Sequence, residues 1–320
     1  HLKGKSMPKI LLLGGTGFIG RNLAYSYTQK PSYEVTLFAR NAVNDEGLLR
    51  RDNLKMVQGD FEQYNDFRGL VKDYDIVFHL ACATTPANSG KCSAARISSD
   101  ISATANLLDA CIREDVGKVV FLSSGGAIYG ANGKVPSSES DPRLPLSYYG
   151  YQKQAIEELY GYYGRAYGLK HCIVRLSNPY GPLQNPTSGL GVVTNFIHRI
   201  LSGCPLQIFG DGSVVRDFIY ISDAVRGMRE IADYDGCETI FNLGSGYGLS
   251  ILEVAHGIQE VLNRFVEVEY LPSRVADVPK NYLSMDKYEG IFGPLNPISF
   301  SEGVERTARH LSGYQTSGRR

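Results

Sequence analysis

The chain has 320 residues, of which 43% are hydrophobic, and its 33 basic residues balance its 33 acidic ones. That length allows one large α/β unit or two lobes, and the balance of charge argues against a nucleic acid or an anionic membrane as the partner. The six cysteines are scattered without a CxxC pair, and no histidine stands at metal-ligand spacing, so we expect reduced thiols, no metal and a cytoplasmic location.

The chain opens with residues 1–6, which resemble an expression remnant rather than a signal peptide, so we expect the native chain to start at Met7. No apolar run approaches the roughly 18 residues that a membrane helix needs.

Short aliphatic or β-branched runs predict strands in the first half of the chain, at Lys9–Leu13, Tyr33–Phe38, Asp75–His79, Lys118–Leu122 and His171–Arg175. Longer segments between them carry apolar residues every three or four positions and predict helices, at Phe18–Gln29, Ser99–Glu114 and Tyr148–Tyr167. Strands therefore alternate with helices. This predicts an α/β fold, a doubly wound parallel Rossmann sheet with helices on both faces.

The pattern loosens after Arg175, where turn-rich segments predict a second, smaller substrate lobe interleaved with the first domain. We expect the dinucleotide-binding domain at residues 7–180, with residues 217–245 returning to it. The substrate lobe is expected at residues 181–216 and 246–312. Within the returning segment, Ile221–Ala232 predicts a helix and Thr239–Leu243 a strand.

A glycine-rich turn follows the first strand, in the stretch LLGGTGFIGR from Leu12 to Arg21. Gly14, Gly17 and Gly20 have the spacing that lets a backbone approach a pyrophosphate at a helix N-terminus. An ordinary glycine turn is the alternative. Asp60 is a candidate acceptor for an adenine amino group, or else it caps a turn.

The end of the second strand bears on which dinucleotide binds, because an acidic residue there pairs with the ribose hydroxyls of NAD. Here the strand ends in Ala39-Arg40, a small residue and a cation that suits a 2′-phosphate. NADP is therefore slightly preferred over NAD. In the alternative, Arg40 stacks on the adenine and NAD binds.

Tyr149 and Lys153 are four residues apart, which places both side chains on one face of a helix. A free tyrosine has a pKa near ~10, but an adjacent ammonium and a nicotinamide cation favour the phenolate. The pair predicts a base for removing a hydroxyl proton while hydride leaves the same carbon. Taken alone, such a pair also arises by chance, since tyrosine packs and lysine snorkels.

Together these features resemble the extended short-chain dehydrogenase/reductases, in the nucleotide-sugar epimerase/dehydratase branch that includes the UDP-glucose 4-epimerases. The resemblance covers nearly the whole chain. Its motifs are GGTGFIG at 14–20, VFHLA at 77–81, Ser123-Ser124 leading into Ile128-Tyr129-Gly130, Tyr149 with Lys153, RLSNPYGP at 175–182 and GDGSVVRDFIYI at 210–221.

The resemblance implies roles for individual residues. Tyr149 would be the acid/base, Lys153 would hold the nicotinamide ribose, and Ser124 would be the third catalytic member. Cofactor contacts are implied at Gly14, Gly17, Phe18, Ile19, Gly20, Arg40, Asp60, Phe61, Leu80, Ala81, Ala83, Ser123, Tyr149 and Lys153. Substrate contacts are implied at Thr84, Gly125, Gly126, Asn178, Asn195, Arg216, Arg274 and Asp277, with the arginines on the diphosphate. For Arg216 the alternative is a surface arginine paired with Asp217.

The chain departs from the family pattern at two positions. Gly125 stands where the epimerases commonly carry a catalytic serine or threonine, and Gly125-Gly126 cannot supply the proton-transfer groups of a 4,6-dehydratase. Ser124 or an ordered water could replace the missing hydroxyl. Asp100 stands where the family often has an asparagine near the lysine.

The expected function is therefore a nucleotide-sugar 4-epimerase acting on a UDP-hexose, by removal and return of hydride at C4. The alternative is an NADPH-dependent 4-keto nucleotide-sugar reductase, and a minor alternative is a dinucleotide-sensing protein without chemistry. The resemblance also implies a homodimer joined through the helices Ser99–Glu114 and Tyr148–Tyr167.

Overall fold

The computed structural model describes residues 7–42, 44–82, 94–130, 133–273 and 278–317, which form two compact units. The first unit comprises His1–Ser123, Tyr148–Val174 and Met228–Phe241, and the second comprises Ser124–Ser147, Arg175–Gly227 and Asn242–Arg320. Each unit is thus assembled from three separate stretches of chain. The lobe boundaries expected from the sequence stay a prediction.

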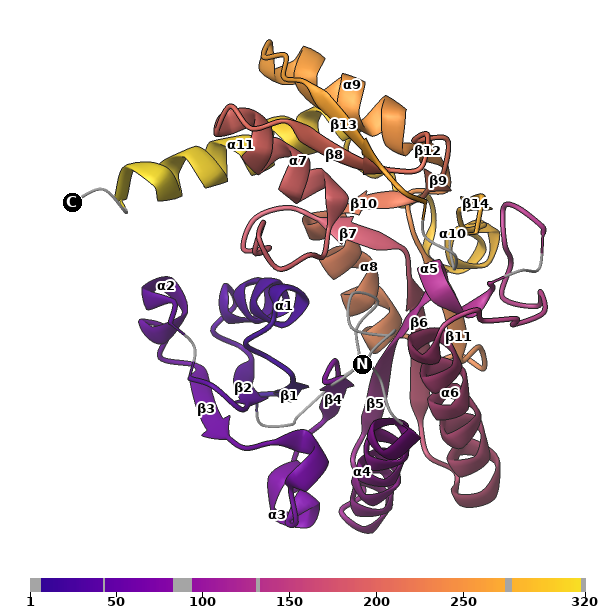
Figure 1. Cartoon of the computed structure of the whole chain (residues 1–320). Helices are drawn as coiled ribbons and strands as arrows, with labels where there is room; N and C mark the ends of the chain where they lie inside the picture. The colour runs from indigo at the N-terminus through magenta and orange to yellow at the C-terminus, as the bar shows by residue number, and fades with distance from the viewer. Residues whose placement is uncertain (1–6, 43, 83–93, 131–132, 274–277, 318–320) are drawn as a thin grey trace. The chain divides into compact units, whose positions relative to one another are not determined.

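A seven-stranded parallel sheet runs through the first unit, in the order β11-β6-β5-β4-β1-β2-β3 (Figure 1). Its strands are β1 (Lys9–Leu13), β2 (Glu34–Ala39), β3 (Leu54–Gln58), β4 (Ile76–His79), β5 (Lys118–Ser124), β6 (His171–Leu176) and β11 (Ile240–Leu243). The predicted doubly wound α/β fold is confirmed. The strand order reverses beside β1, whose last residue pairs with both β2 and β4, and such a reversal opens a crevice at the carboxyl ends of the strands.

Helices cover both faces of this sheet (Figure 1). α1 (Phe18–Thr28) lies on one face, whereas α3 (Phe67–Val71), α4 (Ala94–Arg113) and α6 (Tyr148–Tyr167) lie on the other. Two short elements, α2 (Glu46–Leu49) and the 3₁₀ turn η1 (Phe61–Gln63), flank β3 along the chain. Leu11 and Leu13 of β1 share a buried core with Leu107 of α4 and Tyr160 of α6. The intervening Ile10 and Leu12 are also fully buried, so β1 is apolar throughout because both of its faces are covered.

The described residues of the second unit include short strands that form three small sheets, and the strands of all three are labelled in Figure 1. β7 (Asn178–Tyr180) pairs with β10 (Phe218–Tyr220), and β8 (Leu206–Phe209) pairs with β13 (Val268–Leu271). The third sheet has the order β12 (Leu249–Ser250), β9 (Val215–Arg216), β14 (Lys280–Asn281). The helices are α5 (Gly125–Ile128), α7 (Val192–Leu201), α9 (Ile251–Leu262), α10 (Asp286–Phe292) and α11 (Phe300–Ser317), while α8 (Ile221–Asp233) begins here and ends in the first unit.

Five cysteines fall in the described part of the chain, and all five are free thiols: Cys82, Cys111, Cys172, Cys204 and Cys237. Within the same ranges, no three His, Cys, Asp or Glu side chains come together in a way that could hold a metal ion. None of the described helices combines the length and the apolar character needed to cross a membrane.

Candidate active site

The glycine turn between β1 and α1 is shaped by close backbone contacts. Gly14 has a φ of +84°, and a β-carbon on it would lie 2.9 Å from the Ala81 nitrogen. On Gly20 a β-carbon would lie 2.6 Å from the Gly14 oxygen, so the helix packs against the turn only because both positions are glycine. α1 starts at the N-cap Gly17 without a side-chain cap, so no cap side chain occupies its first amides, which are groups suited to binding an anion. Phe18 and Ile19 belong to this first turn.

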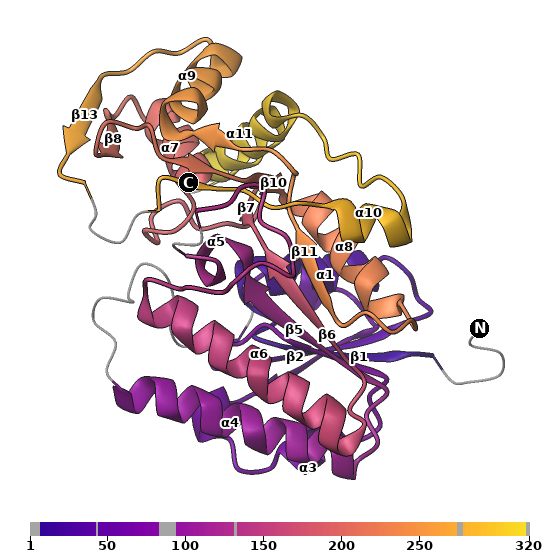
Figure 2. The same cartoon turned by 90° about the vertical axis from the view of Figure 1, so that its right-hand side faces the viewer.

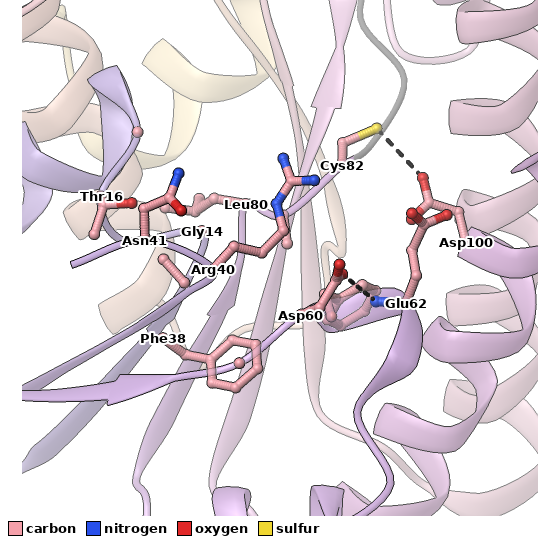
Figure 3. A pocket seen from close by; sticks show the side chains of 15 residues that line it. Gly14, Thr16, Phe38, Arg40, Asn41, Asp60, Glu62, Leu80, Cys82 and Asp100 are labelled. Atoms are coloured by element: carbon pink, nitrogen blue, oxygen red, sulfur yellow. Dashed lines mark hydrogen bonds between the residues drawn. The ribbon is translucent and has the colours of Figure 1, made fainter. Parts of the chain in front are cut away.

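A pocket of about 280 Å³ opens beside this turn, within the first unit (Figure 3). It lies at the carboxyl ends of β1, β2, β3 and β4, where a doubly wound sheet binds its ligand. Of the expected cofactor contacts, seven line it: Gly14, Gly17, Arg40, Asp60, Phe61, Leu80 and Ala81. The other lining residues are Thr16, Phe38, Ala39, Asn41, Gly59, Glu62, Cys82 and Asp100.

Arg40 enters this pocket from the end of β2, and Figure 3 shows its guanidinium reaching across it toward the side of Leu80 and Cys82. Asp60 accepts a hydrogen bond from the Glu62 amide at 3.2 Å and so caps η1. Its carboxylate lines the pocket as well, so the capping role and a ligand contact are compatible.

Tyr149 and Lys153 lie on α6, in the first unit. The Lys153 ammonium donates a hydrogen bond to the Leu122 carbonyl at 2.8 Å and lies 5.8 Å from the centroid of the Tyr149 ring. Burial opposes the charge on Lys153, but Cys82, Tyr149, Asp100 and Glu157 outweigh it, and the net effect raises the pKa of Lys153. Lys153 is therefore a protonated, buried cation at neutral pH.

Ser123 ends the stretch of β5 that belongs to the first unit. Its hydroxyl is buried and has no hydrogen-bond partner within the described residues. A buried hydroxyl of this kind needs a partner. The unpartnered Ser123 hydroxyl and the close backbone turn at Gly14 are both compatible with a dinucleotide bound in the pocket.

His79 is the last residue of β4, and its side chain lies among aromatic rings. Its Nδ1 lies 3.0 Å from the Tyr160 hydroxyl, and its ring packs against those of Phe61 and Phe121. Burial, and then the nearby Lys153 ammonium, lower the pKa of His79 to about 3. His79 is consequently neutral at physiological pH.

Four expected catalytic or substrate residues come together in the second unit: Ser124, Gly125, Gly126 and Asn178. A β-carbon on Gly126 would lie 3.6 Å from Asn178 Oδ1 and 3.8 Å from Ser124 Oγ, so these two polar groups flank an open position. On Gly125 it would lie 2.6 Å from a methyl group of Leu283. Leu283 therefore fills the space that a serine or threonine at position 125 would need.

The remaining expected substrate residues lie on other elements of the second unit or outside the described residues. Arg216 on β9 donates hydrogen bonds from one guanidinium nitrogen to the carbonyls of Val215 and Val278. Asn195 on α7 donates to the Pro186 carbonyl at 3.0 Å. Ala83, Thr84, Arg274 and Asp277 fall outside the described residues.

Eight lining residues were not among the expected cofactor contacts, and six of them are sequence neighbours of an expected one: Thr16, Ala39, Asn41, Gly59, Glu62 and Cys82. The position of these residues in the sequence could have indicated them, because residues just beyond the carboxyl end of a parallel strand face the crevice. The sequence alone does not tell which of the consecutive residues turns inward.

The chain also matches known proteins. A family model described as "NAD dependent epimerase/dehydratase family" matches residues 10–244. A putative UDP-glucose 4-epimerase of Methanocaldococcus jannaschii is 31% identical over 303 residues, covering 94% of this chain and 98% of the relative.

Solved structures agree over the same extent. The UDP-glucose 4-epimerase of Thermotoga maritima, crystallised with UDP-glucose, superposes with a TM-score of 0.88 at 32% identity, over 96% of this chain and 99% of that one. The UDP-glucose 4-epimerase of Thermus thermophilus in complex with NAD gives a TM-score of 0.86 at 29% identity, over 95% and 99% of the two chains.

Proposed function

Because the chain belongs to the NAD-dependent epimerase/dehydratase family and is an enzyme of the extended short-chain dehydrogenase/reductase type, we propose that it is a UDP-sugar 4-epimerase. The observation that carries the proposal is the buried Lys153 ammonium beside Tyr149 on α6. Both residues belong to the same unit as the pocket that the glycine turn lines. A base and a dinucleotide cradle in one unit are what removal of hydride from an alcohol carbon requires.

The residues divide the work as follows. A bound oxidised nicotinamide supplies the hydride acceptor, and in its reduced form the donor. Tyr149 takes the proton of the sugar 4-hydroxyl as the C4 hydrogen leaves with its electron pair, and returns the proton when hydride comes back to the opposite face. Lys153 would stabilise the phenolate and donate a hydrogen bond to the cofactor ribose, and Ser124 would hydrogen-bond the 4-oxygen.

The second unit would hold the nucleotide diphosphate. Arg216 and Arg274 suit phosphate oxygens because a guanidinium binds them at two points. Asn178 and Asn195 would contact the sugar and diphosphate, and Asp277 the nucleotide ribose. Gly126, flanked by the Ser124 hydroxyl and the Asn178 amide oxygen, leaves room for a sugar substituent.

The test is to incubate the purified protein with UDP-glucose, UDP-N-acetylglucosamine or UDP-glucuronate, without added cofactor, and to quantify the C4 epimer by NMR. Conversion by the wild type and its loss in Tyr149→Phe are expected. Tyr151→Phe is the matched control, because Tyr151 lies on the same helix and its side chain is largely exposed. No conversion, with oxidation of NADPH by a 4-keto nucleotide sugar instead, would identify a reductase.

The choice between NAD and NADP depends on Arg40. No carboxylate stands at the end of β2, and the Arg40 guanidinium lies in the pocket, which favours a 2′-phosphate. NADP is expected to bind more tightly than NAD in a competition assay, and Arg40→Asp to reverse the preference. Arg50→Asp, at an exposed arginine on the chain after α2, is the control. Release of NAD alone from the denatured wild type would contradict the NADP preference.

A homodimer is also proposed, joined through α4 and α6. The two helices run side by side (Figure 2), and α6 exposes Tyr151, Tyr162 and Tyr167. Light scattering should give twice the chain mass for the wild type, and Tyr162→Glu should lower it. The free cysteines favour a cytoplasmic location, which fractionation of the native host would test.

A further inference from the structure

A cluster of buried polar groups lies at the Cys82 end of the pocket, beside Lys153. Asp100 of α4 is 2% exposed, and Gln152 of α6 is fully buried. The Gln152 amide donates a hydrogen bond to Asp100 Oδ2 at 2.5 Å. The Cys82 thiol lies 3.7 Å from the same oxygen and 3.8 Å from Gln152 Oε1, and Figure 3 shows Cys82 and Asp100 facing each other across the pocket wall.

This arrangement holds a carboxylate in a fixed place next to a buried cation. Asp100 and Lys153 interact electrostatically, and Asp100 also lines the cofactor pocket. A buried charge is costly unless an opposite charge and hydrogen bonds compensate it. Gln152 and Cys82 supply hydrogen bonds to the carboxylate, and Lys153 supplies the opposite charge.

The other ionisable groups around the cluster come from three elements. α6 contributes Tyr149 and Glu157, the end of β4 contributes His79, and η1 contributes Glu62. His79 is neutral, and Glu157 adds a second carboxylate near Lys153. Lys153 is thus the buried positive group of a cluster that also carries carboxylates, a thiol and a phenol, and the Arg40 guanidinium reaches toward the Cys82 side of this cluster from within the pocket.

We propose that Asp100 is a positioning residue for the Tyr149–Lys153 pair, and that its carboxylate, held by Gln152, offsets the charge of Lys153 so that Tyr149 releases its proton readily only beside an oxidised nicotinamide. The inference rests on the proposed function and deepens it. With Lys153 offset by Asp100, the ammonium alone stabilises the phenolate less. Tyr149 would therefore lose its proton beside an oxidised nicotinamide, which would add a second positive charge, and would hold the proton beside a reduced one, which would add none.

Asp100→Asn tests this because it removes the charge and keeps the size and polarity of the side chain. Tyrosine labelled with ¹³C at Cζ reports ionisation of the phenol by NMR, and Tyr149→Phe assigns the resonance. With the cofactor reduced, the titration midpoint of Tyr149 is expected to fall by about one pH unit in Asp100→Asn. The acid limb of kcat/KM for epimerisation should move to lower pH by a similar amount.

Asp109→Asn is the matched control, because Asp109 is also a carboxylate of α4 but accepts its hydrogen bond from Tyr163. It should leave the Tyr149 midpoint unchanged. Asp100→Ser provides a second uncharged variant if the asparagine does not fold. A midpoint that stays the same or rises in Asp100→Asn, with Asp100→Ser in agreement, would overturn the proposal.

The titration also separates this inference from the proposed function. If the wild type converts no UDP-sugar but the Tyr149 midpoint still falls in Asp100→Asn, the charge role of Asp100 stands and the epimerase assignment fails. If conversion occurs and the midpoint does not move, Asp100 has only a structural role.

Discussion

Restoring a hydroxyl at position 125 should destabilise the protein, because Leu283 already fills the space. A β-carbon on Gly125 would lie 2.6 and 2.9 Å from the two Leu283 methyl carbons and 3.0 Å from the Arg175 carbonyl oxygen. Ordinary contacts between carbon atoms are about 3.5–4.0 Å, so Leu283 would have to move by about 1 Å. It is fully buried against Ile128 and Tyr129, and overpacking of this kind costs about 1–3 kcal/mol.

Gly126→Ser is the matched comparison, since a β-carbon there meets nothing closer than 3.6 Å. Both glycines lie in the first turn of α5, so the effect of a side chain on the unfolded state cancels between the two variants. In urea unfolding followed by circular dichroism, Gly126→Ser should stay within about 0.5 kcal/mol of the wild type. The free energy of unfolding of Gly125→Ser should be lower than that of the wild type by the overpacking cost given above.

A double-mutant cycle completes the test. Leu283→Ala alone should cost about 2–5 kcal/mol, because it leaves a cavity. In that background Gly125→Ser should cost little, giving a favourable coupling of about 1–3 kcal/mol. If Gly125→Ser is as stable as Gly126→Ser, or if the two changes are additive, the steric argument is wrong.

Three further outcomes are expected. Gly14→Ala should lose the bound dinucleotide, seen as a lower 260 nm absorbance of the purified protein, because its φ of +84° and the Ala81 nitrogen 2.9 Å away leave no room for a side chain; full retention would refute this. The folded-state pKa of His79 is lowered from 6.5 to about 3 by burial and then by the nearby ammonium, so the unfolded chain binds the extra proton and stability falls as pH falls through that window. His79→Phe should remove about 3 kcal/mol of this loss between pH 7 and pH 4, and parallel urea curves for variant and wild type would count against it. Ser250→Ala should cost about 1 kcal/mol by breaking the capping box with Glu253, and an unchanged unfolding midpoint would contradict that role.

The first unit was largely predictable because its strands are buried on both faces. Such strands appear in the sequence as continuous apolar runs, and the predicted Lys9–Leu13 has the bounds of β1. The predicted helix Tyr148–Tyr167 likewise has the bounds of α6. β3 was missed because it is an edge strand with the mixed sequence LKMVQ, and none of its residues is fully buried.

The second unit was harder to predict. β9, β12 and β14 have only two residues each, too few for a hydrophobic period to appear. The occupation of the space at Gly125 by Leu283 is a contact between distant parts of the sequence, so no local pattern reports it. The cluster around Asp100 has the same origin, since Cys82, Asp100 and Gln152 come from a loop and two helices.

The division of each unit into three separate stretches has a consequence for biosynthesis. A ribosome delivers residues in order, yet the first unit is complete only when Met228–Phe241 has emerged, after the whole of the second unit's middle stretch, Arg175–Gly227. Until β11 has been synthesised, β6 pairs with β5 on one side only, and its other edge has no partner strand. An unpaired edge of a nascent parallel sheet attracts other chains. A stalled or truncated product ending before residue 240 would therefore be a natural client for chaperones, whereas a gene fusion at either terminus would leave this order of assembly intact.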